Sequence, residues 1–129
     1  MGSYGYGPFD GDSAAEAVMD PIEEIGTELD NLLKAKKNKQ YRYDGARAAA
    51  VALALLSIAR APVPIERLLD GEKCIKQILG DEDWINNWNS PARAKRAVKQ
   101  DLKLVQSAIN RILRMLHWTR EMVEASRKR

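Results

Sequence analysis

The sequence predicts an all-α fold: a single-domain antiparallel bundle of four to five helices, with an irregular N-terminal strip packed on it. Apolar residues recur at helical spacing along most of the chain, and proline and capping residues separate these segments. Alternation typical of a strand is absent except for a weak pattern at residues 40–43. The 129 residues fit one domain spanning residues 1–129, with a frayed basic tail expected at 127–129.

Residues 1–12 have the composition of a docking strip, because glycines alternate with aromatic residues and no signal-peptide pattern is present. We expect Tyr4, Tyr6 and Phe9 to fill grooves between helices. Asp10 and Asp12 are expected to accept hydrogen bonds from local amides where the first helix begins. The alternative is that the two tyrosines and the two aspartates line a ligand site.

The first helix is predicted to begin at a capping box, Ser13–Glu16, in which the serine accepts an amide hydrogen bond and the glutamate reaches back. Pro21 is expected to interrupt this helix, and Asp20 to cap its restart. The segment that follows has an apolar stripe on one side and acids on the other. A basic stretch at residues 34–39 ends it and suits the negative end of the helix dipole.

The second predicted helix runs from Gly45 to about Ala61, with Asp44 as its cap, and is stopped by Pro62 and Pro64. This segment is apolar almost all round. Such a helix is typical of the middle of a bundle, where alanines let neighbouring helices approach closely.

The third helical region covers residues 65–79, where apolar residues again recur at helical spacing. Asp70 and Gly71 are expected to break it into a short helix and a longer one. Gly80 fits a C-terminal cap for the longer piece.

Trp84 and Trp88 are spaced to share one helical face, where they either close the end of the bundle or form an interface hot spot. The last helix is predicted to begin at Ser90 and Pro91 and to run to about Ser126. A heptad pattern along it indicates packing within a bundle more than a separate coiled coil, and it leaves a homodimer open. The heptad positions are Val98, Leu102, Val105, Ile109, Ile112, Leu116, Thr119 and Val123.

Charge is unevenly distributed along the chain, whose formal net charge is +3. Residues 1–33 contain acids but no lysine or arginine, whereas residues 91–129 contain eleven bases and three acids. The favoured interpretation is that the acidic first helix and the basic last helix lie together and neutralise each other. The alternative is that each helix faces a different partner.

The chain opens with Met1-Gly-Ser-Tyr-Gly-Tyr-Gly-Pro-Phe-Asp-Gly-Asp12, which resembles the start of a bacterial family known as domain of unknown function 4259. It departs from that family at Tyr4, where tryptophan is usual, and at Gly11, where asparagine is usual. The alanine-rich second helix also looks similar. The resemblance implies a compact, mostly helical domain from bacteria or their phages, with no activity or catalytic residue to carry over. The matching positions are Gly2, Gly5, Gly7, Phe9, Asp10 and Asp12.

The sequence contains no convergent set of reactive groups, so we expect no enzyme, no cofactor and no metal site. His117 is expected at a surface or an interface, and Cys74 to be a small buried hydrophobic residue; these two are too few for a zinc site. A single cysteine excludes a disulfide within the chain and suggests a reducing, cytoplasmic location. The longest apolar run, residues 48–56, is too short to cross a membrane.

Binding functions remain. We favour a non-catalytic protein-interaction module, which in a phage would be an inhibitor or regulator of a bacterial defence or nucleic-acid-processing complex. The alternative is a nucleic-acid-binding protein that uses the basic last helix. The candidate partner-binding residues are Asp20, Glu23, Glu24, Glu28, Trp84, Trp88, Arg93, Arg96, Lys99 and Lys103.

Overall fold

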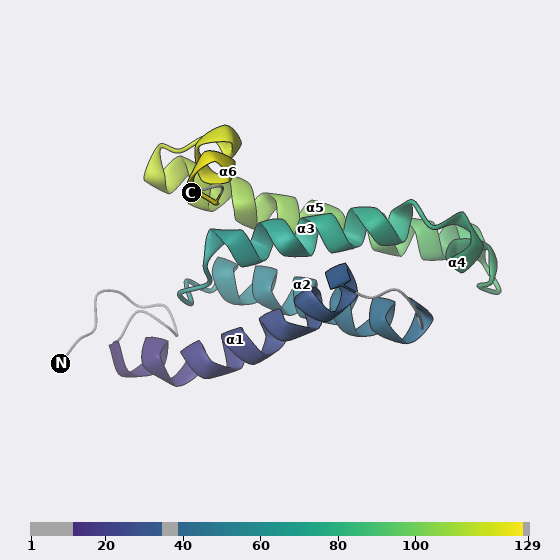
Figure 1. The fold of residues 1–129 in the computed structure, drawn as a ribbon, viewed down its shortest axis with the longest axis horizontal. Coiled ribbons are helices and arrows are strands. Elements are labelled where there is room, and N and C mark those ends of the chain that lie inside the picture. Colours follow the sequence, from purple (N-terminus) through teal and green to yellow (C-terminus); the bar gives the residue numbers. More distant parts are fainter. Residues whose placement is uncertain (1–11, 35–38, 128–129) are drawn as a thin grey trace.

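The computed structural model describes residues 12–34 and 39–127, and every regular element within these ranges is a helix (Figure 1). The all-α prediction is therefore confirmed. The N-terminal strip with Tyr4, Tyr6, Phe9 and Asp10 lies outside the described residues, as do residues 128–129, and Asp12 is the first residue of α1. In chain order the helices are α1 (Asp12–Lys34), α2 (Lys39–Ile58), α3 (Ile65–Leu79), α4 (Glu82–Asn86), α5 (Pro91–Leu116) and α6 (Arg120–Arg127).

Helices α2 and α3 form the centre of the bundle. Both α1 and α5 pack on this pair, whereas α1 and α5 do not pack along each other. The four long helices run alternately in opposite directions, so the bundle is antiparallel (Figure 1). The sequence predicts that the acidic first helix and the basic last helix pack together and neutralise each other. This is wrong for α5, which carries most of the bases, because the central pair separates it from α1.

The core is built from the apolar stripes of these helices. Burying one large aliphatic side chain is worth about 1.5–3 kcal/mol relative to leaving it in water. Packing of the stripes, more than helix propensity, therefore fixes where each helix lies. The largest side chains that are fully buried are Leu29, Leu32, Tyr43, Leu53, Leu68, Ile75, Ile78, Val98, Val105, Ile109 and Val123.

Helix α1 continues through Pro21, so the predicted interruption does not occur. The proline removes one backbone hydrogen bond, to the carbonyl of Ala17, but both residues are exposed and water can replace the lost donor. The buried residues Ile22 and Leu29 keep one face continuous beyond the proline. The side chains of residues 13–16, and with them the predicted capping box, lie outside the described part of the chain.

Helix α2 begins at Lys39, earlier than predicted. Asp44 consequently lies inside the helix and does not cap it, and residues 40–43 are helical and not a strand. The extension carries Tyr43 onto the same buried face as Ala46, and Tyr43 is only 1% exposed. Burial of this large ring explains why the helix starts before its expected cap.

Helix α3 is a single helix without a break at Asp70 and Gly71. A Cβ atom on Gly71 would lie 3.0 Å from the Cβ of Ala50 and 3.4 Å from its Cα, so the glycine permits the close approach of α2 and α3. Gly80 takes the C-cap position as predicted. Its φ of −80° is a right-handed conformation that other residues also adopt.

Two non-glycine residues, Arg60 and His117, adopt left-handed φ angles of 71° and 54° just after α2 and α5. Each closes its helix with the paired backbone hydrogen bonds of a Schellman motif. At the end of α5 the amide of His117 donates to the carbonyl of Arg114 at 3.3 Å, and the amide of Trp118 donates to the carbonyl of Leu113 at 2.9 Å.

The predicted last helix is therefore two helices. α5 ends at Leu116, and α6 folds back towards α3 (Figure 1). The heptad pattern holds up to Ile112, but Leu116 is exposed and Thr119 lies in the connection between the helices. Val123 is only 1% exposed, so α6 docks by burying this one side chain against the bundle.

Gly71→Leu tests the close contact between α2 and α3. Leucine favours helix, so any destabilisation reports the missing space beside Ala50 and not the loss of helix propensity. We expect the free energy of unfolding in urea to fall by about 1–3 kcal/mol, as for overpacked cores. Gly80→Leu is the control, because a Cβ there meets only ordinary contacts at 3.5 and 3.6 Å, and we expect a change within about 0.5 kcal/mol. Equal effects of the two substitutions would contradict the packing argument.

Candidate interaction surface

Cys74 and His117, the two reactive residues that the sequence singles out, lie in different surroundings in the structure. Cys74 is fully buried, and its Sγ lies 3.7 Å from the carbonyl oxygen of Leu29. Burial, with a smaller contribution from Asp70, raises the pKa of the Cys74 thiol to about 12, so the thiol stays protonated at neutral pH. His117 is exposed at the end of α5, and the two residues do not pair. Within the described ranges, no group of three or more His, Cys, Asp or Glu residues could hold a metal ion.

The tryptophan pair closes one end of the bundle. Because α4 ends at Asn86, Trp84 and Trp88 do not share a helical face as predicted. Trp84 is buried, and its ring lies edge-on to Tyr43 and to Trp88, with centroids 5.5 Å apart in both contacts. The Tyr43 hydroxyl donates to the Asp81 carboxylate at 2.8 Å, and burial together with this contact raises the pKa of Tyr43 to about 12. Only Trp88, 45% exposed, remains accessible to a partner.

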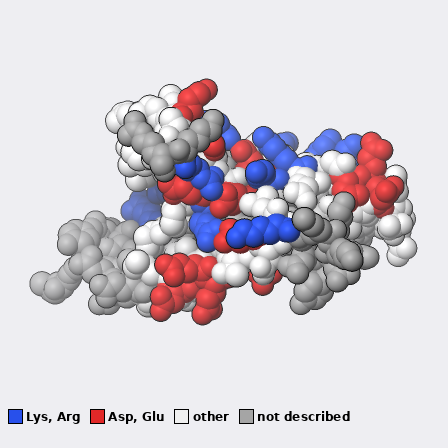
Figure 2. Space-filling model, viewed as in Figure 1, with Lys and Arg blue, Asp and Glu red and all other residues white. Residues whose placement is uncertain are grey.

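The charged candidates lie on exposed faces of two helices that do not pack along each other, the acids on α1 and the bases on α5. In Figure 2, acidic side chains gather over α1. The single acid of α5, Asp101, forms an ion pair with Arg47 of α2. Further along α5, Arg111 donates to the carbonyl of Ser57 at 3.0 Å, so it serves the fold. The predicted basic surface is thus concentrated in the first half of α5. The exposed candidates are Asp20, Glu23, Glu24 and Glu28 on α1 and Arg93, Arg96, Lys99 and Lys103 on α5.

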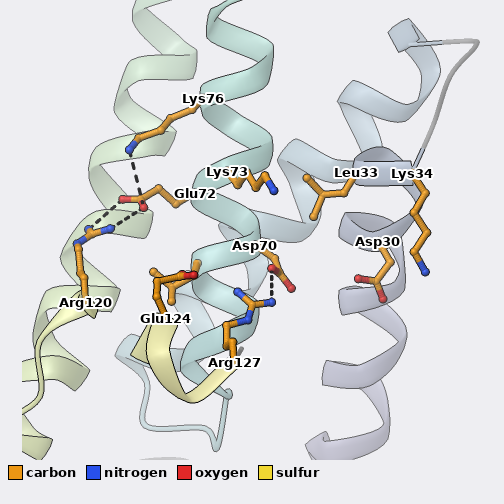
Figure 3. Close-up of a pocket in the computed structure, with 11 residues that line it drawn as sticks. Asp30, Leu33, Lys34, Asp70, Glu72, Lys73, Lys76, Arg120, Glu124 and Arg127 are labelled. Carbon is orange, nitrogen blue, oxygen red and sulfur yellow. Dashed lines mark hydrogen bonds and ion pairs between the residues drawn. The ribbon is translucent and has the colours of Figure 1, made fainter. Parts of the chain in front are cut away.

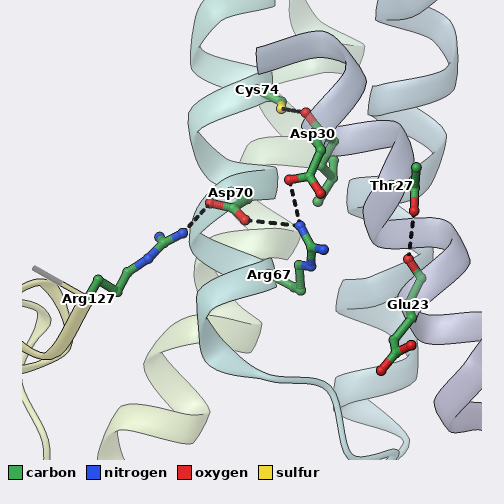
Figure 4. Close-up of polar contacts among 8 residues, drawn as sticks. Glu23, Thr27, Asp30, Arg67, Asp70, Cys74 and Arg127 are labelled. Atoms are coloured by element: carbon green, nitrogen blue, oxygen red, sulfur yellow. Dashed lines mark hydrogen bonds and ion pairs between the residues drawn. The ribbon is translucent and has the colours of Figure 1, made fainter. Parts of the chain in front are cut away.

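An ion-pair network that the sequence did not predict joins α1, α3 and α6 (Figure 4). The Arg67 guanidinium donates to Asp30 at 2.7 Å and to Asp70 at 3.5 Å, and Arg127 donates to the other oxygen of Asp70 at 2.9 Å. A Cβ on Gly26 would lie 2.7 Å from Nε of Arg67, so this glycine lets the arginine lie across α1. The hydrogen bond from Arg67 lowers the pKa of Asp30.

The second part of the network holds the start of α6. The two terminal N–H groups of Arg120 donate hydrogen bonds to the two carboxylate oxygens of Glu72, at 2.6 and 2.9 Å. Nζ of Lys76 lies 3.9 Å from the same carboxylate (Figure 3). Burial raises the pKa of Glu72, but the hydrogen bonds and charge of Arg120 outweigh it, and the pKa lies below its usual value. These groups line a cavity of about 590 Å³. The Asp30, Asp70 and Glu72 carboxylates that line this cavity each form an ion pair with an arginine. We therefore interpret the cavity as part of the seam that holds α6 against the bundle.

The outer face of α2 has a composition that does not suit exposure to water. Leu55 is 53% exposed and Ile58 is 43% exposed, although the sequence predicted that neighbouring helices would surround α2. Ala48 is exposed as well, and Val51 and Ala52 are partly exposed. Their spacing of three and four residues places all five on one side of the helix, and we call this surface the α2 outer face. The prediction that α2 is enclosed is therefore wrong for this side of the helix.

The α2 outer face lies beside a surface hollow. The hollow measures about 460 Å³ and is lined by Ala48, Val51, Ala52 and Leu55, with the ion pair between Arg47 and Asp101 at its edge.

A second hollow of about 430 Å³ follows beyond the end of α2. It is lined by residues that include Arg60, Ala61, Ile112 and Met115, and Met115 is 65% exposed. Ser57 and Arg111 line it as well, and none of its lining residues belongs to the α2 outer face.

Comparison of the chain with protein-family models, with curated proteins and with solved structures gives no match. The resemblance of the N-terminal motif to domain of unknown function 4259 therefore stays a prediction. In the part of the chain that the structure describes, no helix has both the length and the apolar composition needed to cross a membrane.

Glu72→Gln tests the contact that holds α6. The pKa of Glu72 is lower in the folded protein than its reference value of 4.5, so the ionised carboxylate stabilises the fold above that pH. We expect the substitution to lower the free energy of unfolding by about 1–2 kcal/mol at neutral pH, because a charge-assisted hydrogen bond is lost. The difference from the wild type should shrink as the pH falls below 4.5, in urea titrations at several pH values. Glu121→Gln, at an exposed position of α6, is the control. A difference that does not depend on pH would contradict this assignment.

Proposed function

We propose that this protein is a non-catalytic protein-interaction module that binds a helix along the α2 outer face. The observation that supports the proposal is the exposure of Leu55 and Ile58 beside an apolar hollow. The exposed faces of α1 and α5 carry charges, whereas the five residues of the α2 outer face carry none. Exposed apolar surfaces of this kind are typical of protein interaction sites.

A helix fits this surface better than an extended segment does. Recognition of a helix in a groove uses anchors at positions i, i+3, i+4 and i+7, and the spacing from Ala48 to Val51 and Leu55 matches it. The small side chains of Ala48 and Ala52 would let a partner helix approach to about 8 Å between axes, the short end of the usual range. An inhibitor role in a bacterial defence or nucleic-acid-processing complex stays a prediction that identification of the partner would test.

Leu55→Glu tests this function in a pull-down from a bacterial lysate that also contains an untagged copy of the chain. We expect the tagged wild-type protein to retain at least one protein, foreign or the untagged copy, after nuclease treatment. Leu55→Glu should reduce its recovery by at least about tenfold, since burial of a charge opposes apolar docking. Quantitative mass spectrometry of the eluate measures the recovery.

Met19→Glu is the matched control, because Met19 on α1 is 51% exposed and Leu55 is 53% exposed. Circular dichroism and a thermal melt of both variants check that they fold. Retention of the same proteins by wild type and Leu55→Glu would refute binding at the α2 outer face.

Nucleic-acid binding is the second candidate function, and the arrangement of charge on α5 favours it. The cations at Arg96, Lys99 and Lys103 share one exposed face, and the single acid of the helix, Asp101, is paired with Arg47. Such a face can contact phosphates without local repulsion from a carboxylate.

Replacing Arg96, Lys99 and Lys103 with glutamine tests this candidate. If all three contact phosphates, the slope of the logarithm of the binding constant against the logarithm of salt concentration should become shallower by about 3 for duplex DNA. Fluorescence anisotropy at several salt concentrations measures the slope. The control replaces Lys34, Lys73 and Lys76 with glutamine, which removes the same charge near the α6 seam. An equal change in both variants would mean that only net charge matters.

A further inference from the structure

We propose that the exposed face of α5 binds a single strand of nucleic acid, with phosphates along its cations and one unpaired base stacked on Trp118. This binding mode rests on the second candidate function, nucleic-acid binding by α5. Two features support it: a continuous polar stripe along α5, and a hollow with an exposed tryptophan at the end of that stripe.

The stripe consists of six exposed residues on one side of α5, and we call it the α5 stripe. Successive spacings of three, four, four, three and four residues keep its members on one side of the helix. At 1.5 Å per residue the stripe is about 27 Å long. Four members are cations and two are neutral and polar, so the stripe contains neither an acid nor an apolar residue. The members are Arg96, Lys99, Lys103, Ser107, Asn110 and Arg114.

The cations of the α5 stripe are available to phosphates. Asp101 lies two residues from both Lys99 and Lys103, which places it on another side of the helix, where it pairs with Arg47. Among the described residues, no ion pair uses a cation of the stripe. Nε of Arg114 lies 3.5 Å from the backbone carbonyl one turn earlier, which is a neutral acceptor. A row of cations without carboxylates suits a phosphate backbone.

The α5 stripe ends at a hollow of about 720 Å³, where α5 turns into α6. Asn110 and Arg114 of the stripe line this hollow together with Leu113, His117 and Trp118. The amide of Trp118 donates to the carbonyl of Leu113 at 2.9 Å, which fixes the backbone that carries the indole ring. A guanidinium and an indole therefore share one hollow, so a phosphate and the base attached to it can be bound together.

Trp118 differs from the other two tryptophans in what its ring contacts. Trp84 and Trp88 lie edge-on to each other, with centroids 5.5 Å apart, and close the far end of the bundle. Trp118 is 44% exposed, and in the part of the chain that the structure describes no aromatic ring packs against it. Its ring is therefore open to stacking by a base.

Stacking on Trp118 selects a single strand over a duplex. Bases inside a duplex are already stacked on their neighbours, whereas the bases of a single strand can turn outwards onto an aromatic side chain. An acidic peptide could pair with the cations but carries no flat base for the indole. Single-stranded DNA and RNA supply the same phosphates and bases, so both are included in the test.

Trp118→Ala tests the stacking site by fluorescence anisotropy, with labelled strands of oligo-dT and oligo-U about 16 nucleotides long. We expect the wild type to bind both strands. The substitution should raise their dissociation constants at least about fivefold, the effect of losing one stacked base, and should change that of a duplex less than about twofold. The dependence of single-strand binding on salt should not change, because no charge is removed, whereas Arg114→Gln should make its slope shallower by about 0.7.

Trp88→Ala is the matched control, because Trp88 is 45% exposed and follows α4, at the opposite end of the bundle from the α5–α6 turn (Figure 1). Trp118→Phe should keep most of the affinity, since a phenyl ring also stacks on bases. Circular dichroism and thermal melts check that each variant folds. Single-strand affinity unchanged by Trp118→Ala, an equal loss for the duplex, or an equal loss in Trp88→Ala overturns the proposal.

These results also separate the stacking site from the functions proposed above. Single-strand binding that needs the α5 cations but not Trp118 leaves nucleic-acid binding standing and removes the stacking site. A wild type that binds neither strand removes both. Poly-glutamate that binds more tightly than either strand would identify an acidic peptide as the occupant and overturn the proposal. Leu55→Glu should not change oligonucleotide binding, because the α2 outer face and the α5 stripe share no residue.

Discussion

The close contact between α2 and α3 at Ala50 and Gly71 is the constraint on which the other helix positions depend. Because neither residue projects a large side chain there, α1 and α5 can each pack across both central helices. Leu29 of α1 reaches this contact, 3.9 Å from the Cβ position of Gly71. Helix α2 thus uses one side for α3 and its flanks for α1 and α5. The described chain contains no further helix for its outer face.

Helix α6 is held by a different balance of forces. A helix of eight residues is not stable in isolation, and Val123 is its one buried side chain. The left-handed conformation of His117 adds a further cost, since residues with a Cβ atom disfavour it. The bidentate contact of Arg120 with Glu72 and the contact of Arg127 with Asp70 offset these costs. Because Glu72 is buried and its charge is matched by Arg120, breaking one partner leaves an uncompensated charge.

Periodicity predicted the helices and most of their buried faces, but it did not predict their ends. Tyr43 extends α2 backwards because burying its ring outweighs the local signal of Asp44 as a cap. No glycine marks the end of α5 in the sequence, because His117 takes the left-handed position that glycine usually fills. This helix end depends on the contacts that α6 makes with α3. The Arg120–Glu72 pair joins residues 48 apart in sequence. Spacing rules apply to neighbours three or four residues apart on one helix, so they could not predict this contact. Helix α2 is apolar on almost all sides, so its sequence has no polar stripe that would show which side stays exposed.

The composition of the α2 outer face separates two explanations for its exposure. Alanine has the highest helix propensity, so Ala48 and Ala52 would suit an exposed helix that binds nothing. Val51 and Ile58 do not fit that explanation, because β-branched residues lower helix propensity and gain nothing from contact with water. Leu55 would be replaced by lysine or glutamate at no cost in propensity if solubility were the only demand. The alternation of large and small apolar residues along this face is therefore explained best by contact with another helix.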